Sequence, residues 1–360
     1  MSQSATNLAA LLPGVGKTLV LEERAIPSPG PDEILIRNRA IALNPIDWKR
    51  QAFGIAVPSD RAIILGSDVA GEVVSVGSNI PSSLFTPGDR VLGSADGMMS
   101  GNPDHAAFQR YTIVSATSAS KLPDTLSFPE AATLPTAFGT AVIALFHDLG
   151  LPLPTGPSTS KQNEKKGILV WGGATAVGSA AIQLARLAGL TVYATASPTH
   201  HARVRALGAA EAVDYRSAGP TSAADEILAA AGKTGVEIGY VLVAAGDKEV
   251  FAAVKQVLES SPRAGDGGKI KKVASLLPWP EEEVAKPEGA EVSWVRGMEM
   301  WRGRRDLSAW LNHQNLKGWL EKGEVEPHKV RVVQGGIGGL QAALDELKKG
   351  VSGEKLVVEP

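Results

Sequence analysis

One stretch decides how the second half of the chain folds: Trp171-Gly172-Gly173-Ala174-Thr175-Ala176-Val177-Gly178. It joins an apolar run typical of a buried strand to a segment with the apolar spacing of a helix. Against the pattern G-x-G-x-x-G, Gly173 and Gly178 match and Thr175 replaces the middle glycine. Small residues here allow a tight turn and a close approach of the backbone to a pyrophosphate, which the first amides of the helix would bind.

From residue 167 onward the chain alternates between strand and helix. We expect strands at residues 168–171, 191–196, 212–215, 238–244, 269–276 and 290–296, and helices at residues 177–188, 199–207, 222–231 and 248–259. This rhythm predicts an open parallel sheet with helices on both faces. In that setting we interpret Gly173, Thr175, Ala176, Val177 and Gly178 as a dinucleotide-binding turn; the alternative is a tight turn without a ligand.

The end of the second strand indicates which nicotinamide cofactor fits. Enzymes that use NAD place an acidic residue there, about 20 residues past the first glycine. Here no acidic residue occurs before Glu211. The residues that could face a 2′-phosphate are Ser197, His200, Arg203, Tyr215 and Arg216. The sequence therefore favours NADPH.

A second interpretation of this segment remains open. His200 and His201 could lie in the solvated first turn of a helix that Ser197 or Thr199 caps, with Pro198 at its start.

The remainder of the chain has a different pattern. Residues 17–90 alternate short apolar runs with Gly and Pro, which predicts short strands in an antiparallel, barrel-like domain. We expect a helix over residues 129–149, broken at Pro135 and Gly139, and a surface loop over residues 152–167. Helices at residues 307–322 and 340–349 and strands at residues 329–333 and 355–358 would return to complete the first domain. The expected boundaries are 1–140 with 306–360 for that domain, and 141–305 for the dinucleotide-binding domain.

A second glycine-rich turn lies near the C-terminus. Residues 335–339 also join a strand to a helix, but no strand–helix–strand unit surrounds them, so we interpret them as a flexible turn.

Composition excludes several classes of protein. The chain has 360 residues, a formal net charge of −2 and no cysteine. Disulfides, thiolate nucleophiles and cysteine-bound metals are therefore excluded, and the charge gives no reason to expect nucleic acid as a partner. Residues 1–13 lack the charged region of a signal peptide, and no uninterrupted apolar stretch approaches the roughly 20 residues of a membrane span. We expect a cytoplasmic monomer or homodimer that does not bind membranes.

Further segments carry a resemblance to a known family. They are residues 42–49 (ALNPIDWK), 66–73 (GSDVAGEV), 107–111 (AFQRY), 131–137 (AATLPTA), 196–198 (ASP) and 351–355 (VSGEK). In this order, together with residues 171–178, they resemble the zinc-independent medium-chain dehydrogenases/reductases of the quinone oxidoreductase branch, and in particular the fungal trans-acting enoyl reductases that serve polyketide synthases. This resemblance implies a GroES-like β-barrel catalytic domain and a Rossmann domain with a doubly wound parallel sheet.

The resemblance also assigns site residues by motif. Ile46, Asp47, Trp48 and Lys49 would approach the nicotinamide, with Lys49 as a candidate for positioning or charge stabilisation. The other residues expected at NADPH are Thr175, Ala176, Val177, Ser197, Pro198, Thr199, His200, Tyr215, Val351 and Ser352. The substrate pocket would be lined by Thr133, Leu134, Pro135, Thr136, Ala137, Phe138, Gly139 and Thr140, with Thr136 as a hydrogen-bonding group.

Simpler roles remain open for the residues after Pro45. We expect these residues to turn, which places Lys49 on a loop; Trp48 could be a core residue and Lys49 an ordinary surface lysine. Likewise, Asp68 could simply hold its local turn.

The zinc-dependent relatives carry Cys where Asn44 stands and His where Ser67 stands, and no histidine occurs before His105. Without a Lewis acid, reduction of an activated C=C bond fits better than alcohol oxidation. The expected activity is NADPH-dependent reduction of an enone or an α,β-unsaturated acyl thioester in secondary-metabolite biosynthesis, with the substrate free or bound to a carrier protein. The alternatives are a quinone or small-enone oxidoreductase and a non-catalytic NADPH-binding scaffold. No proton donor is identifiable.

Overall fold

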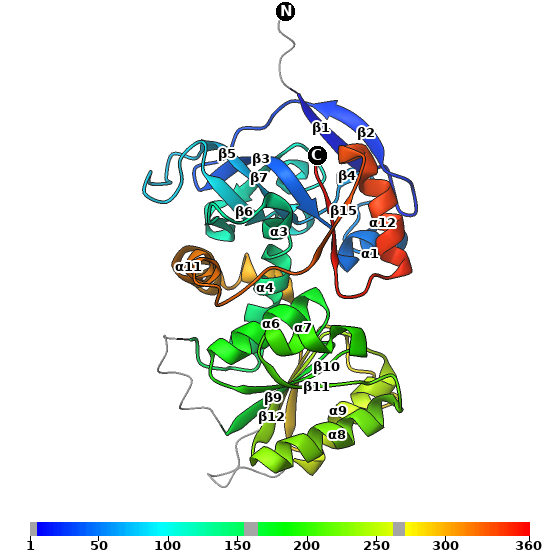
Figure 1. Ribbon diagram of the computed structural model, residues 1–360. Helices are drawn as coiled ribbons and strands as arrows, with labels where there is room; N and C mark the ends of the chain where they lie inside the picture. The colour runs from blue at the N-terminus through cyan, green and yellow to red at the C-terminus, as the bar shows by residue number, and fades with distance from the viewer. Residues whose placement is uncertain (1–5, 155–164, 262–270) are drawn as a thin grey trace, which may run out of the picture. The chain divides into compact units, whose positions relative to one another are not determined.

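The computed structural model describes residues 6–154, 165–261 and 271–360 (Figure 1). The expected loop at residues 152–167 and the expected start of a strand at residue 269 fall partly outside these ranges. The chain divides into two compact units, each with its own core. Unit 1 comprises Met1–Thr136 and Trp301–Pro360, and unit 2 comprises Ala137–Met300.

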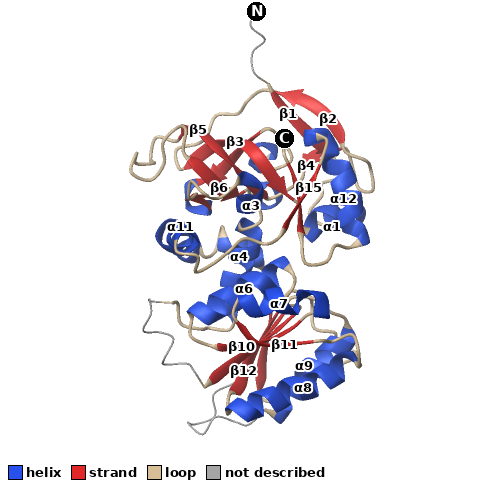
Figure 2. Ribbon diagram, in the orientation of Figure 1, coloured by secondary structure: helices blue, strands red, loops and turns tan. Residues whose placement is uncertain are grey.

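Unit 2 is built on a six-stranded sheet in which every neighbouring pair is parallel (Figure 2). The strand order is β11-β10-β9-β12-β13-β14. These strands are β9 (Lys166–Trp171), β10 (Thr191–Thr195), β11 (Ala209–Val213), β12 (Glu237–Val243), β13 (Lys271–Ser275) and β14 (Ala290–Trp294). Counted from β9 this is the order 3-2-1-4-5-6 of a Rossmann sheet, whose direction of winding reverses between β9 and β12.

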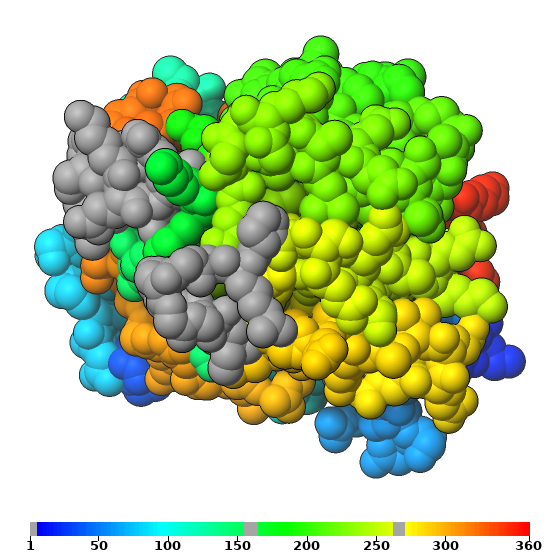
Figure 3. All heavy atoms as spheres, turned by 90° about the horizontal axis from the view of Figure 1, so that it is seen from below, coloured from blue at the N-terminus to red at the C-terminus, as the bar shows by residue number. Residues whose placement is uncertain are grey.

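Helices cover both faces of this sheet, with α6 and α7 on one side and α8 and α9 on the other (Figure 1). They are α6 (Ala176–Leu187), α7 (His201–Ala206), α8 (Gly219–Thr234) and α9 (Lys248–Ser260). In the space-filling view, the yellow-green to yellow part of the chain, which includes α8 and α9, forms a continuous surface (Figure 3). Because these helices cover its face, β12 carries fully buried side chains such as Val241 and Val243.

Unit 1 is mainly antiparallel. A seven-stranded sheet runs β15-β16-β3-β5-β6-β8, with β7 also paired to β3, and a three-stranded sheet runs β2-β1-β4. Their bounds are β1 (Asn7–Leu12), β2 (Val20–Arg24), β3 (Glu33–Ala42), β4 (Ile63–Ile64), β5 (Asp68–Val76), β6 (Arg90–Ser94), β7 (Tyr111–Ser115), β8 (Ala119–Lys121), β15 (Val330–Val333) and β16 (Lys355–Val358). β16 pairs with β3, so the last strand of the chain completes a sheet begun by the first part.

The helical segments of unit 1 lie around these sheets. They are α1 (Pro45–Phe53), α2 (Gly97–Ser100), η1 (Pro103–His105), η2 (Ala116–Ser118), α3 (Phe128–Ala132), α10 (Arg305–Ala309), η6 (Trp310–Asn315), α11 (Leu316–Glu321), η7 (Gly336–Gly339) and α12 (Leu340–Lys349). The mainly antiparallel unit 1 and the open parallel sheet of unit 2 confirm the two expected architectures.

Three sequence-based expectations about local structure were wrong. The helix expected over residues 129–149 breaks once, between α3 and α4 (Pro135–Val142), because Pro135 is the first residue of α4, where its missing N–H costs nothing. Gly139 lies buried inside α4, which continues as a π-helix over Ile143–Asp148. The strand expected at residues 212–215 begins and ends earlier, as β11 at Ala209–Val213. The glycine-rich turn at residues 335–339, expected to be flexible, contains the 3₁₀-helix η7.

The loop expected after Pro45 was also wrong, since these residues form helix α1. Pro45 is its first residue, and the carboxylate Oδ2 of Asp47 accepts from the backbone N–H of Asn44 at 2.8 Å. Gly54 ends the helix in the left-handed region with φ 75°. Lys49 therefore lies on a helix, one turn from its start.

One helical segment of the described residues, Phe128–Asp148, is long and apolar enough to cross a membrane by length and composition. Because 78% of its apolar window is buried inside the protein, it has the character of a core helix.

Candidate functional site

The glycine-rich turn between β9 and α6 has the geometry that a phosphate-binding turn requires. Gly172 has φ 88°, which favours glycine, and the hydroxyl of Thr175 accepts from the N–H of Gly178 at 2.9 Å to cap α6. The N–H groups of Ala176 and Val177, the first two of the helix, have no carbonyl one turn earlier to bond. Two amides at a helix N-terminus are therefore available for an anion.

Gly173 and Gly178 are required by the packing of the protein itself. A Cβ on Gly178 would lie 2.2 Å from the carbonyl oxygen of Gly172, and one on Gly173 would lie 3.0 Å from the Cβ of Ala194. Both glycines therefore bring the helix close to the strand whether or not a ligand is present. Sequence reasoning assigned them to cofactor contact, and that contact stays a prediction.

The ends of three neighbouring strands are joined at this edge of the sheet. Gly172 and Gly173 donate to the hydroxyl and carbonyl oxygens of Thr195 at 3.0 and 2.8 Å. Ala196 donates to the carbonyl of Val213 at 3.0 Å. The fingerprint, Ser197 after β10 and Tyr215 after β11 thus share the carboxyl edge of one parallel sheet, where ligands of such sheets bind.

The segment after β10 carries no acidic side chain. Ser197 is 7% exposed and precedes the 3₁₀-turn η4 (Pro198–His200), in which Pro198 and Thr199 are exposed and His200 is half-buried. The ring of His201 lies 2.9 Å from the carbonyl oxygen of Ala196, a structural contact.

Two arginines show how charge is distributed beside this edge. The guanidinium of Arg216 lies 5.6 Å from the ring centroid of Tyr215, so a planar cation stands beside one of the expected cofactor residues. Glu211 accepts from Arg205, a contact that lowers the pKa of its carboxyl group. The nearest acid in sequence is therefore neutralised by a partner.

Sequence reasoning missed residues on the other side of the switch point. Ala244 donates to the carbonyl of Trp171 at 2.9 Å, which places the turn after β12 beside the fingerprint. Ala245 is half-buried and Gly246 is exposed, and Asp247 caps α9 through its contacts with Glu249 and Val250. The small residues between a strand and a capped helix were the available signal.

In unit 1, Asp68 is the centre of a buried polar network. Its side chain is 0% exposed and accepts from Asn44 Nδ2 at 2.9 Å and from Lys355 Nζ at 2.5 Å. Its Oδ1 accepts from both the N–H and the hydroxyl of Thr136, at 2.9 and 2.6 Å. Asp68 thus connects β5, the start of α1, the start of α4 and β16, well beyond the local turn.

This network fixes the polarity of the Thr136 hydroxyl. Its proton points at Asp68, so only the oxygen lone pairs remain for another group. Thr136 can therefore accept a hydrogen bond from a ligand N–H or O–H. Among the eight expected substrate residues it is the half-buried one, while the other seven are buried: Thr133, Leu134, Pro135, Ala137, Phe138, Gly139 and Thr140.

The expected nicotinamide-end residues lie along α1. Ile46, Trp48 and Lys49 are half-buried, and Lys49 Nζ lies 5.9 Å from the ring centroid of Trp48. Trp48 packs against the unit 1 core. α1 packs against α12, and Val351 and Ser352 follow the end of α12. The structure therefore brings the α1 residues and the pair Val351 and Ser352 into one part of unit 1. Their contacts with a cofactor stay predictions.

Asp47 differs from its neighbours on α1 because its side chain is buried. It is 1% exposed, and burial raises the pKa of its carboxyl group to about 7. Asp68 raises it further, whereas the hydrogen bond from Asn44 and the charges of Arg50 and Lys355 lower it. Its side chain serves the start of α1.

The two positions at which the resemblance places zinc ligands carry neither Cys nor His in this chain. At position 44, the side-chain amide of Asn44 donates to Asp68. Position 67 is a serine. Within residues 6–154, 165–261 and 271–360 no group of three or more His, Cys, Asp or Glu side chains could hold a metal ion.

Known proteins match this chain over most of its length. Residues 30–124 match the alcohol dehydrogenase GroES-like domain. The trans-enoyl reductase tndF of Aspergillus flavipes is 36% identical, covering 97% of this chain and 98% of its own. The chain belongs to the trans-enoyl reductase family. As a member of this family it is an oxidoreductase of the class that acts on C=C bonds.

Solved structures of enzymes related to this enoyl reductase family share the fold. An alcohol dehydrogenase superfamily protein from Novosphingobium aromaticivorans superposes with a TM-score of 0.77 at 25% identity, covering 99% of this chain and 100% of that one. A mycobacterial protein, Rv1454c, was solved as a complex with NADPH; it superposes with a TM-score of 0.72 at 20% identity over 98% of this chain and 100% of its own.

The described residues of this family member fit a nicotinamide dinucleotide. The turn at Gly172 has the positive φ of a phosphate turn, two amides at the start of α6 are available, and no side chain projects from Gly173. These features lie at the switch point of the sheet, where such cofactors bind.

Proposed function

We propose that this protein is an NADPH-dependent enoyl reductase that reduces an α,β-unsaturated acyl thioester or enone, in secondary-metabolite biosynthesis in the cytoplasm. The observation that carries the proposal is the end-to-end similarity to a trans-enoyl reductase, in both units of the chain. The fold, with Asn44 and Ser67 at the former zinc positions, supports chemistry that needs no Lewis acid.

The cofactor would be held at the carboxyl edge of the unit 2 sheet. The amides of Ala176 and Val177 would bind its pyrophosphate, and Ser197 would lie near the ribose that carries the 2′-phosphate. Ser197 supports NADPH because a hydroxyl does not repel a phosphate as Asp or Glu would. Arg216, exposed on the ring of Tyr215, supplies a planar cation of the kind that binds phosphate oxygens.

When bound, the reduced nicotinamide would supply a hydride to the β-carbon of the substrate, and the α-carbon would then take a proton from a side chain or water. Lys49 would stabilise the negative charge that develops on the carbonyl oxygen, since its compact charge stands on a long stem. Thr136 would accept a hydrogen bond from an N–H of substrate or cofactor, because its own proton is directed at Asp68. Asp68 is thus a positioning residue that acts through Thr136.

The acyl chain would be carried by a thioester, free or attached to the carrier domain of a synthase. Relatives named trans-enoyl reductase support this choice over a free quinone. A non-catalytic NADPH-binding scaffold is the alternative of another class.

The deciding experiment is a titration of the purified protein with NADPH and with NADH, followed by turnover assays. Cofactor fluorescence gives both dissociation constants. Oxidation of NADPH is then measured with an enoyl N-acetylcysteamine thioester, a simple enone and a benzoquinone. We expect tighter binding of NADPH and fastest oxidation with the thioester. Faster turnover of the quinone would establish the quinone reductase instead, and binding without oxidation by any acceptor would establish the scaffold.

A variant of Ser197 tests the cofactor assignment directly. Ser197→Asp should weaken NADPH binding by roughly 1–3 kcal/mol, since it sets a negative charge against the 2′-phosphate. Ser197→Asn, which adds similar volume without charge, is the matched control. Equal dissociation constants of the wild type for NADPH and NADH would refute the preference.

A further inference from the structure

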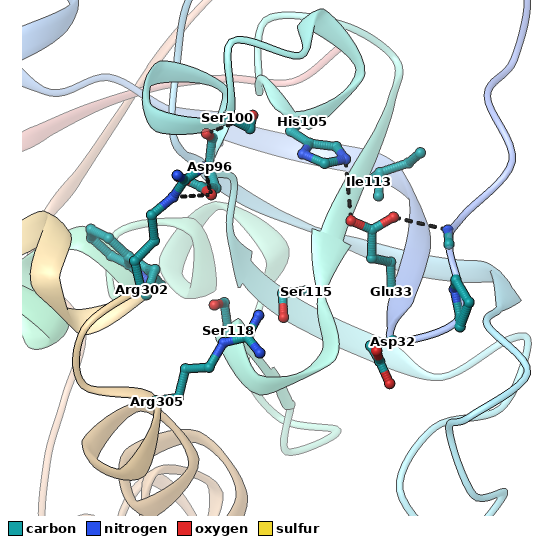
Figure 4. A pocket seen from close by; sticks show the side chains of 13 residues that line it. Asp32, Glu33, Asp96, Ser100, His105, Ile113, Ser115, Ser118, Arg302 and Arg305 are labelled. Atoms are coloured by element: carbon teal, nitrogen blue, oxygen red, sulfur yellow. Dashed lines mark hydrogen bonds and ion pairs between the residues drawn. The ribbon is translucent and has the colours of Figure 1, made fainter.

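Unit 1 contains a cavity of about 540 Å³ that shares no residue with the candidate cofactor and substrate sites (Figure 4). Its wall is made by the chain before β3, by β7, by η2 and by the segment that enters α10. This volume lies in the range of about 300–1,000 Å³ that small-molecule sites occupy. Ile113 and Trp301 supply the apolar part of the lining.

Most of the charged groups around this cavity already have partners. Asp96 is paired with Arg302 at 3.1 Å. Glu33 is paired with His105 at 3.2 Å and accepts from the N–H of Gly30 at 2.8 Å. These pairs leave little charge in their part of the wall for a ligand to neutralise.

Asp32 completes the acidic part of the wall. Its Oδ1 accepts from the side-chain amide of Asn79 at 3.0 Å, so this carboxylate also has a partner.

Arg305 differs from these groups. It is exposed and lines the cavity, and its guanidinium makes no hydrogen bond or ion pair within residues 6–154, 165–261 and 271–360. The neighbouring Arg304 is held by Asp306 through two hydrogen bonds, at 2.9 and 2.7 Å. Of these two successive arginines, one is therefore engaged by the protein and the other offers its donors to the cavity.

A second polar group lines the cavity beside this guanidinium. Ser118 is 2% exposed and lines the cavity, and its hydroxyl makes no hydrogen bond to the described residues. A hydroxyl that lines a cavity in this way can donate a hydrogen bond to an acceptor bound there. Figure 4 shows the Arg305 guanidinium and the Ser115 and Ser118 hydroxyls in the same part of the cavity.

We propose that this cavity is a second ligand site that binds a small organic monocarboxylate, with its oxygens on Arg305 and Ser118 and its apolar body against Ile113 and Trp301. A guanidinium matches a planar carboxylate in geometry and charge. Arg305 offers one positive charge, which a monocarboxylate neutralises, whereas a phosphate dianion would keep a net negative charge beside the carboxylates of the lining. The site does not depend on the reductase function.

The test is isothermal titration calorimetry of the whole protein with sodium hexanoate, methyl hexanoate and hexyl phosphate, in the presence of saturating NADPH. We expect hexanoate to bind the wild type and the ester to give no measurable heat. Arg305→Gln should weaken hexanoate by about tenfold or more, the scale of losing a charged hydrogen bond. Ser118→Ala should weaken it by a smaller factor.

Arg304→Gln is the matched control, because Arg304 neighbours Arg305 and does not line the cavity. It should leave the hexanoate dissociation constant unchanged. Absence of hexanoate binding, or equal binding by Arg305→Gln, overturns the site. Tighter binding of hexyl phosphate than of hexanoate overturns the assignment to a monocarboxylate.

Discussion

The ammonium group of Lys355 donates to the Oδ2 of Asp68 at 2.5 Å, in a region where the two residues are 5% and 0% exposed. The two residues are 287 positions apart in the chain. Their ion pair joins β16, the last strand, to β5 at the point where Asp68 also binds Asn44 and Thr136.

Removal of Lys355 should therefore be strongly destabilising. Lys355→Met leaves a buried carboxylate without its cation, and we expect a loss of about 3–5 kcal/mol of unfolding free energy. Urea unfolding followed by circular dichroism measures it. Lys329→Met is the control, since the Lys329 side chain is 68% exposed and its ammonium lies 3.9 Å from Glu354; this pair should contribute less than about 1 kcal/mol. Equal losses of unfolding free energy in the two variants would show that the buried pair stabilises the protein no more than the exposed pair does.

Thr136 should tolerate serine and not valine. Thr136→Ser keeps the hydroxyl that donates to Asp68 at 2.6 Å, whereas Thr136→Val keeps the shape and removes it. We expect valine to cost about 1.5–3 kcal/mol of stability, the scale of a hydrogen bond to a charged group. If the hydroxyl oxygen also accepts from substrate, the KM of Thr136→Val should rise while that of Thr136→Ser stays near wild type. Steady-state kinetics beside urea unfolding separates the two effects.

Lys49 should show its role in kinetics without a change in stability. Alanine is a good helix former, so Lys49→Ala leaves α1 intact. Stabilisation of a developing enolate predicts that kcat and kcat/KM fall together, because that contact is made mainly in the transition state. Contact with cofactor or ground-state substrate alone predicts a higher KM at similar kcat. Lys348→Ala, on the exposed end of α12, is the control, and wild-type constants for Lys49→Ala would remove it from the site.

Val177 offers a sharper test of the phosphate turn than the glycines do. Gly178→Val would collide with the Gly172 carbonyl and fail structurally, so a loss of binding there says nothing about phosphate. Val177→Asp places a negative charge at the start of α6, which should leave the helix as stable or more so. The same charge should weaken NADPH by about tenfold or more, the scale of a charged contact. Val177→Asn is the neutral control, and unchanged affinity in Val177→Asp would place the pyrophosphate elsewhere.

Asp47 should make the protein less stable as pH rises towards neutrality. Burial raises the pKa of its carboxyl group from 3.8 to about 7, so the folded state binds this proton more tightly than the unfolded state. The resulting stabilisation is complete below about pH 4 and is lost as pH rises to about 7, roughly 4 kcal/mol in all. Asp47→Asn keeps an acceptor for the Asn44 N–H without the charge.

The comparison of these two proteins across pH isolates the contribution of Asp47. Relative to Asp47→Asn, the wild type should lose unfolding free energy between about pH 4 and pH 7. If the unfolding free energies of the two proteins change with pH in parallel, Asp47 ionises in the folded state with an ordinary pKa.

The local pattern of the chain determined most of unit 2. The glycines of residues 171–178, the apolar strand at residues 168–171 and the helix that follows are consecutive in sequence, so their geometry depends on short-range sterics. The same reasoning placed α12 and β16 at their observed bounds. It failed at α1, where Pro45 was interpreted as a turn and instead begins a helix.

Tertiary structure alone decided what the polar residues do. Nothing near Asp68 in sequence indicates that Lys355 neutralises it or that it orients the hydroxyl of Thr136, because these partners come from β16 and α4. Nor does the sequence show that Arg305 and Ser118 line one cavity, or that the carboxylate of Asp47 is buried. Periodicity and glycine spacing are properties of neighbouring residues, and a chain shows them before it folds. Burial and charge pairing depend on residues far apart in the chain, so they arise only when the sheets have formed and packed.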